Sequence, residues 1–236
     1  MDVSRPSAII NLMRKTGFAN NEFYHVYNRG VDRRFIFSDN FDIQRFYQSM
    51  KEFNSVEPIG SIYENSFSKL GRETSKLEQK HDPLVNIISY CLNPNHFHLM
   101  LEQKIGGGIS EFMKRLGGGY TKYFNNKTKR RGVLFQGVFQ SRHINNNEYL
   151  LHLSAYVSLN DRVHQLGRET SKLNKSCWNE YVNGEIGLCE KEIILKQFKS
   201  TKEYEKFALS SLQNIIERKT LLHQLEEFLI EEREIR

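Results

Sequence analysis

The sequence predicts an α+β protein in which helices pack on a mainly antiparallel sheet. Strand-like and helix-like segments alternate along the chain, and two strand-like segments, 85–92 and 96–102, are separated only by Asn93-Pro94-Asn95. This spacing predicts a β-hairpin. The chain has 236 residues, of which 39% are hydrophobic, enough to enclose a core. We therefore expect a ferredoxin-like core with a helical C-terminal appendage.

The first half of the chain is expected to supply one strand and one helix. Residues 22–29, EFYHVYNR, have the alternation and the β-rich composition of a strand. Asp39 or Asn40 can cap a helix over about 41–53, where apolar side chains recur at helical spacing. The polar stretch at about 60–82 is expected to be an insertion in a loop.

The second half is expected to supply the remaining strand and helices. A helix is indicated over about 109–124, although Gly117, Gly118 and Gly119 weaken it. Residues 132–144 are expected to be extended with turns, and 148–159 to form an amphipathic helix; about 190–236 is helical in pattern. The chain is accordingly divided into an N-terminal arm (1–20), a main domain (21–165) and a C-terminal helical appendage (166–236).

Composition excludes several classes of protein. No apolar run approaches the roughly 20 residues that a membrane span needs. The N-terminus lacks the apolar stretch and cleavage site of a signal peptide. The three cysteines, Cys91, Cys177 and Cys189, form no CxxC pair, so neither a zinc knuckle nor a disulfide framework is indicated. We expect a cytoplasmic protein that makes no membrane contact.

The charge distribution favours a nucleic-acid partner. The net charge is +6 and the pI is about 9.1. Eight basic residues fall between Lys114 and Arg142, with no acidic residue after Glu111. Aromatic residues lie among them, and bases can stack on aromatic rings while cations meet phosphates. A solvated basic face is the alternative interpretation.

The motif His96-Phe97-His98 is a candidate metal site. Residues two apart on a strand point to the same face, so both imidazoles can reach one ion while Phe97 enters the opposite face. An HxH motif alone is weak, because most such pairs are surface or hydrogen-bonded histidines.

Tyr156 and Asn160 form a second candidate constellation. They are four residues apart at the end of the helix expected over 148–159, and therefore lie on one face. An amide oxygen with two imidazoles leaves open positions on a divalent ion, which suits a metal that polarises a phosphate. A nearby cation also lowers the cost of forming a tyrosine phenolate nucleophile. The alternative is that Tyr156 belongs to the core and Asn160 is a C-cap.

Three sequence blocks resemble the REP-associated tyrosine transposases, which are HUH enzymes related to bacterial single-strand transposases. The blocks are PNHFHLML, GGYTKYFNNKTKRRGVLFQGVFQSRHI and YLLHLSAYVSLN, and the resemblance extends over about 22–160. It implies that His96, His98 and Asn160 bind the metal, Mg²⁺ or Mn²⁺, and that Tyr156 is the nucleophile. It also implies cleavage of single-stranded or hairpin DNA through a 5′-phosphotyrosine intermediate. The protein is then expected to be of bacterial type and nucleoid-associated when bound to DNA.

The sequence departs from this family in two places. One is the polar insertion at about 60–82. The other is Asp161, which follows Asn160 where relatives usually have proline; this weakens helix termination but changes no ligand.

Two other tyrosines compete for the role of nucleophile. Tyr120 and Tyr123 lie in the basic aromatic helix, where tyrosine can stack on bases or fill the core. Neither has an amide one turn later, because those positions hold Phe124 and Lys127. Tyr156 is therefore the first candidate.

Charge and motif neighbourhood also indicate a set of DNA contacts. These are Arg29, Arg33, Arg34, Lys122, Arg130, Arg131, Gln136 and Arg142. Two other functions share the same features, namely a catalytically inert hairpin-binding protein and a replication-initiator nuclease. Whether the protein is a monomer or a homodimer stays open.

The peptide LGRETSKL occurs twice without a mismatch, at 70–77 and 166–173. Two copies are too few for a solenoid. The peptide can be encoded by an inverted repeat, so we expect two insertions of a palindromic element, both in surface loops where added length costs little. The alternative is a duplicated structural or binding motif, which predicts similar folded environments for both copies.

Overall fold

The computed structural model describes residues 17–60, 62, 82–163 and 173–234, with side chains up to Arg218. Its strands form one five-stranded sheet in the order β4-β1-β3-β2-β5, and every neighbouring pair is antiparallel. The strands are β1 (Phe23–Arg29), β2 (Val85–Asn93), β3 (His96–Gln103), β4 (Gln140–Ile144) and β5 (Lys175–Ser176).

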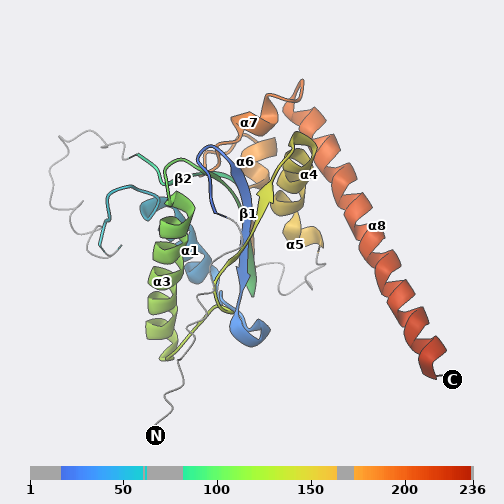
Figure 1. The fold of residues 1–236 in the computed structure, drawn as a ribbon, viewed down its shortest axis with the longest axis horizontal. Helices are drawn as coiled ribbons and strands as arrows, with labels where there is room; N and C mark the ends of the chain where they lie inside the picture. Colours follow the sequence, from blue (N-terminus) through green and yellow to red (C-terminus); the bar gives the residue numbers. More distant parts are fainter. Residues whose placement is uncertain (1–16, 61, 63–81, 164–172, 235–236) are drawn as a thin grey trace, which may run out of the picture.

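The succession β1-α1-β2-β3-α3-β4 with the spatial order 4-1-3-2 is the ferredoxin-like arrangement, so the predicted fold class is confirmed. Helices α1 (Asn40–Glu52) and α3 (Gly108–Thr128) cover one face of the sheet. Helix α4 (Asn147–Ser158) lies on the other face (Figure 1). The shorter helices are the 3-10 turn Val31–Arg33, α5 (Asn160–Val163), α6 (Trp178–Val182) and α7 (Glu192–Leu195).

Side-chain caps begin two of these helices. Asp39 accepts a hydrogen bond of 3.0 Å from the backbone N–H of Asp42 and so caps α1, as the sequence predicted. Asn146 caps α4 in the same way, accepting 2.7 Å from the N–H of Tyr149. These caps satisfy N–H groups that have no partner within the helix.

Helix α3 continues through its three glycines. A Cβ atom on Gly119 would lie 2.7 Å from Cε2 of Phe53, so a larger residue here would require the Phe53 ring to move. Gly117 and Gly118 face open space instead. The helix is therefore stabilised by its packing, which offsets the low helix propensity of glycine.

The alternation of β3 divides its side chains between the two faces of the sheet. Phe97 packs on Phe46 and Phe135 in the core beneath α1 and α3. His98 instead meets the ring of Tyr156 of α4 edge-to-face on the opposite face. The predicted placement of Phe97 away from the histidine pair is thus confirmed.

The C-terminal segment joins the same core. β5 pairs with β2, and Tyr181 and Tyr204 are fully buried. Helix α8 (Thr201–Glu234) runs along α4 and extends beyond the sheet (Figure 1). β5 and α6 were not predicted.

Two sequence features lie outside the described residues. They are most of the polar insertion at about 60–82 and both copies of LGRETSKL except Leu173. Among the helices of the described chain, none combines the length and the apolar character needed to cross a membrane.

Candidate active site

A cavity of about 470 Å³ lies between the sheet and α4. The predicted nucleophile Tyr156 and the predicted metal ligand His98 line it, and β1 adds His25 and Tyr27. Ile215 of α8 contributes to its wall. The lining is completed by Arg142, Tyr149, His152 and Leu153.

The structure brings the predicted histidine pair and Tyr156 together. The rings of His96 and His98 have centroids 5.2 Å apart and are nearly perpendicular. The Tyr156 ring meets His98 edge-on at a centroid distance of 5.7 Å. The side chain of Asn160 is fully buried beside them, with its Oδ1 3.2 Å from Nε2 of His96. All four predicted chemical residues therefore converge.

Hydrogen bonds determine the tautomer of His96. Its Nδ1 lies 2.6 Å from Oδ1 of Asn95, which can only accept, so Nδ1 carries the proton. Its Nε2 then has a lone pair, which accepts from Nδ2 of Asn93 at 2.9 Å. The same Nδ2 donates to Oδ1 of Asn160 at 2.8 Å. Nε2 of His96 and Oδ1 of Asn160 are thus neighbouring acceptors.

The donor atoms fit a divalent cation. Two ligands about 2.1 Å from an octahedral ion are separated by about 3.0 Å when they are adjacent. The 3.2 Å separation between Nε2 of His96 and Oδ1 of Asn160 is close to this value. Within the described chain, no three His, Cys, Asp or Glu side chains converge as metal ligands. A cation here would therefore use two imidazoles and the Asn160 amide.

His25 holds the second predicted ligand. Its Nε2 lies 2.9 Å from Nδ1 of His98, in a buried contact between β1 and β3. If His98 donates through Nδ1, its Nε2 carries the lone pair that can bind a cation. A hydrogen bond to the remote nitrogen commonly orients a metal-binding histidine in this way.

The phenol of Tyr156 is protonated at neutral pH. Burial raises its pKa, and a hydrogen-bonding approach of the Asn160 amide works in the opposite direction. In the part of the chain that is described, Nδ2 of Asn160 makes no hydrogen bond of normal geometry. Ionisation of Tyr156 for attack would therefore need help from a nearby positive charge.

The rival tyrosines lie on the other side of the sheet. Tyr120 is fully buried, and its hydroxyl donates to the carbonyl of Ile36 at 2.6 Å. Tyr123 donates to the buried carboxylate of Asp42 at 3.0 Å. Burial raises the pKa of both phenols, and the Asp42 carboxylate raises that of Tyr123 further. Their environment is that of structural residues.

The predicted DNA contacts are not gathered into one site. Arg142 lines the cavity that holds Tyr156. Arg29 donates to Gln136 across the β1 exit, and Arg34 pairs with Asp32 at 3.3 Å. The other four are spread over the β1 exit turn, α3 and the loop that follows it: Arg33, Lys122 and Arg131, which are exposed, and Arg130, which is partly buried.

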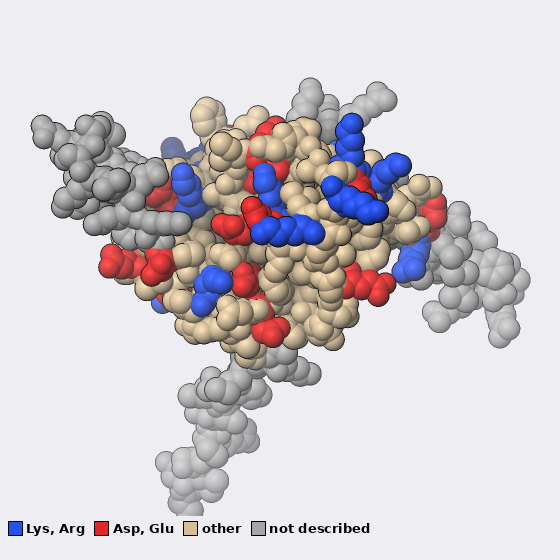
Figure 2. Space-filling model, turned by 90° about the horizontal axis from the view of Figure 1, so that it is seen from above, with Lys and Arg blue, Asp and Glu red and all other residues tan. Residues whose placement is uncertain are grey.

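Intramolecular pairs use part of the basic segment. Lys127 bonds to Asp39 at 2.7 Å and to Asp42 at 2.6 Å. Arg115 bonds to Glu111 at 2.8 Å. On the face in Figure 2, Lys and Arg are interspersed with Asp and Glu wherever residues are described. The net charge of the segment therefore overstates the cations available to DNA.

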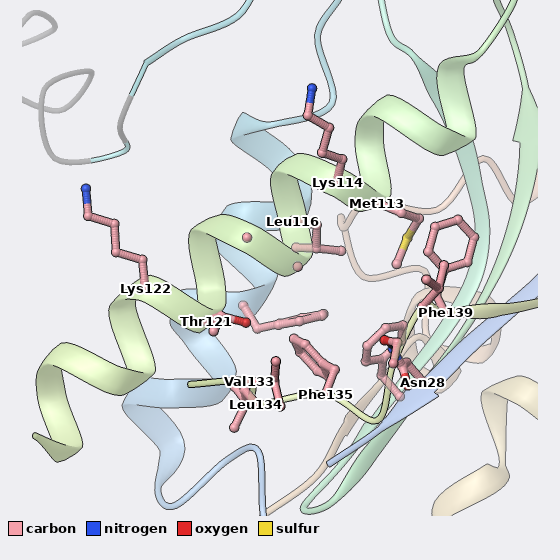
Figure 3. Close-up of a pocket in the computed structure, with 16 residues that line it drawn as sticks. Asn28, Met113, Lys114, Leu116, Thr121, Lys122, Val133, Leu134, Phe135 and Phe139 are labelled. Atoms are coloured by element: carbon pink, nitrogen blue, oxygen red, sulfur yellow. Dashed lines mark hydrogen bonds between the residues drawn. The ribbon is translucent and has the colours of Figure 1, made fainter. Parts of the chain in front are cut away.

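A second cavity, of about 480 Å³, lies on the α3 side of the sheet. Its lining is largely apolar and includes Phe97, Phe135 and Phe139 (Figure 3). Lys114 and Lys122 extend from α3 away from these rings. Because this lining contains no His, Cys, Asp or Glu, the cavity with Tyr156 is the candidate active site.

Sequence reasoning missed His25, Asn93 and Asn95. His25 lies in a segment predicted to be a strand. Its contact with His98 depends on how β1 pairs with β3, which the sequence does not indicate. Asn93 and Asn95 precede the HxH motif and were interpreted only as turn residues. His152 had a usable signal, because it precedes Tyr156 by four residues and faces the same cavity.

We expect His25 to make stability depend on pH. Its pKa is lowered from 6.5 to about 4, first by burial and then by the charge of Arg142. Between these values the unfolded chain binds more protons than the folded protein, so stability falls as the pH falls. Urea unfolding in EDTA at pH 7 and pH 4.5 should give a loss of roughly 2–3 kcal/mol from this residue. In His25→Gln the loss of unfolding free energy between these pH values should be smaller by that amount. If stability falls equally with pH in both proteins, His25 is not the group responsible.

Comparison with known proteins agrees with the resemblance to transposases noted in the sequence. Residues 68–160 match the family model described as "Transposase IS200 like", and this stretch contains the four converging residues. The chain is also similar to a solved structure described as "Structure of the REP associates tyrosine transposase bound to a REP hairpin". That likeness has a TM-score of 0.46 at 13% identity and covers 72% of this chain and 85% of that chain. None of the curated proteins matches.

Proposed function

We propose, from the match of residues 68–160 to the IS200-like transposase family, that this chain is a metal-dependent endonuclease and strand transferase acting on single-stranded DNA. The observation that carries the proposal is the position of Tyr156. Its ring contacts His98 beside Asn160 and His96, and it lines an accessible cavity. A nucleophile next to a cation site is an arrangement suited to phosphoryl transfer.

The reaction is a transesterification. The phenolic oxygen of Tyr156 bonds to a backbone phosphorus, and the bond from phosphorus to the 3′ oxygen breaks. The phenol loses its proton and the leaving 3′ oxygen gains one, so a 5′-phosphotyrosine and a free 3′ hydroxyl result. One phosphodiester replaces another, so rejoining needs no nucleotide energy.

Each site residue has a definite part in this chemistry. His96, His98 and Asn160 would hold Mg²⁺ or Mn²⁺, which when bound supplies charge to neutralise the non-bridging oxygens and orient the phosphate. His25 and Asn95 orient the two imidazoles through their Nδ1 atoms. Arg142 lies at the cavity, where it can meet a phosphate of the entering strand.

The proposed substrate is single-stranded DNA that carries a short hairpin. The three sequence blocks support it through their resemblance to REP-associated transposases. The decisive experiment is incubation of the chain with hairpin-bearing oligonucleotides and Mn²⁺, followed by a denaturing gel. A covalent adduct supports the enzyme, whereas hairpin binding without an adduct supports the inert binding protein.

We expect Arg142→Ala to weaken DNA binding and to reduce its salt dependence. Arg142 is exposed on β4 and lines the cavity of Tyr156. Loss of one phosphate contact to a single strand should lower the slope of log K against log salt by about 0.7. Fluorescence anisotropy at several salt concentrations measures this slope. Lys51→Ala, which removes an exposed cation from α1 across the sheet, should leave it unchanged; equal effects of both variants would argue against a contact at Arg142.

A further inference from the structure

Asn93 occupies the centre of the candidate metal site. It is the last residue of β2 and is fully buried. Its Nδ2 lies 2.9 Å from Nε2 of His96 and 2.8 Å from Oδ1 of Asn160. One NH₂ group therefore donates a proton to each of the two atoms that the cation would use.

The chemistry of imidazole makes these two uses incompatible. An unprotonated ring nitrogen has a single lone pair in the ring plane. Nε2 of His96 cannot accept from Asn93 and bind a cation at the same time. The amide oxygen of Asn160 has two lone pairs and is not limited in this way. Cation binding by His96 must therefore break the hydrogen bond from Asn93.

We propose that Asn93 is a positioning residue that holds His96 and Asn160 together in the metal-free protein and competes with the cation for them. This inference rests on the proposed function, because it assumes that His96 and Asn160 are ligands. The NH₂ group of Asn93, which carries a partial positive charge, takes the place of the cation between the two acceptors. Metal entry then requires the Asn93 side chain to move away from His96.

The test is Mn²⁺ binding by calorimetry on the DNA-free full chain. In Asn93→Ala the competing donor is gone, so the affinity for Mn²⁺ should rise about 3- to 10-fold, as expected for one net hydrogen bond. In Asn93→Asp a carboxylate replaces the NH₂ donor and can itself bind the ion. The affinity should then rise more than about 10-fold.

Thermal unfolding gives a second readout for the same variants. Without metal, Asn93→Asp places an acceptor against two acceptors, so its Tm in EDTA should fall. Mn²⁺ should restore the Tm of this variant more than that of the wild type. If Asn93→Asp folds only when Mn²⁺ is present, that result also supports competition between Asn93 and the cation.

Asn95→Asp is the matched control. It makes the same change of charge beside the same imidazole, but at Nδ1, where the carboxylate still accepts the proton of His96. Its Mn²⁺ affinity should rise less than that of Asn93→Asp, because this carboxylate stays in the outer shell and does not itself bind the ion.

The two proposals fail in different ways. If Mn²⁺ binding depends on His96 but is unchanged or weaker in Asn93→Ala, and Asn93→Asp binds no more tightly than Asn95→Asp, the competition is wrong and the metal site stands. If wild type and His96→Ala bind Mn²⁺ equally, the metal site is wrong and the inference falls with it.

Discussion

Tyr156→Phe is expected to abolish the covalent DNA adduct while leaving hairpin binding nearly intact. The change removes the only atom that would bond to phosphorus and preserves the ring that packs on His98. Loss of a nucleophile should lower cleavage by at least about three orders of magnitude. An oligonucleotide labelled at its 3′ end follows the adduct on a denaturing gel, because the fragment with the 5′ phosphate stays on the enzyme.

Tyr120→Phe is the matched control for that experiment. It also removes one phenolic oxygen, but from a buried residue that bonds to the carbonyl of Ile36. This variant should unfold at a lower temperature and still form the adduct. An adduct that persists in Tyr156→Phe and disappears in Tyr120→Phe would overturn the assignment of the nucleophile.

His96→Ala and His98→Ala are each expected to suppress cleavage strongly. The loss should exceed the roughly 10- to 100-fold that changes in outer-shell partners of metal sites cause. Asn160→Ala should have a milder effect, because water replaces an amide oxygen more readily than it replaces an imidazole. Cleavage rates over a Mn²⁺ titration measure all three, and an excess of Mn²⁺ should partly rescue Asn160→Ala.

His143→Ala controls for the loss of an imidazole. His143 lies on β4, pairs with Glu22 at 2.8 Å and does not line the cavity. Its cleavage rate should stay close to that of the wild type. Full activity of the His96→Ala/His98→Ala double variant in EDTA would show that the reaction needs no metal at these residues.

Much of the fold could be predicted because its signals are local. The hairpin was indicated by a two-strand pattern around Asn93-Pro94-Asn95, and α1 and α4 begin within one residue of their predicted starts. The opposite placement of Phe97 and the histidines follows from strand alternation alone. β5 could not be predicted, since two residues carry no periodic pattern.

Only those residues of the candidate site that lie close together in the sequence could be predicted. Residues at short spacings come together when they lie on one strand or one helix. This applies to His96 and His98 and to Tyr156 and Asn160. The partners that orient them depend on register and on long-range packing, as with His25 against His98. The same limit applies to charge: Lys127 belongs to a basic segment but pairs with Asp39 and Asp42 of a distant helix.

The cavity takes side chains from nearly the whole length of the described chain, from His25 on β1 to Ile215 on α8. Contacts between such distant residues carry a large entropic cost, because long loops must close to form them. A chain still on the ribosome has its paired histidines long before α8 can pack on α4. The order of synthesis therefore delays the completed cleft until α8 has been made, and a chain released before α8 would lack one of its walls.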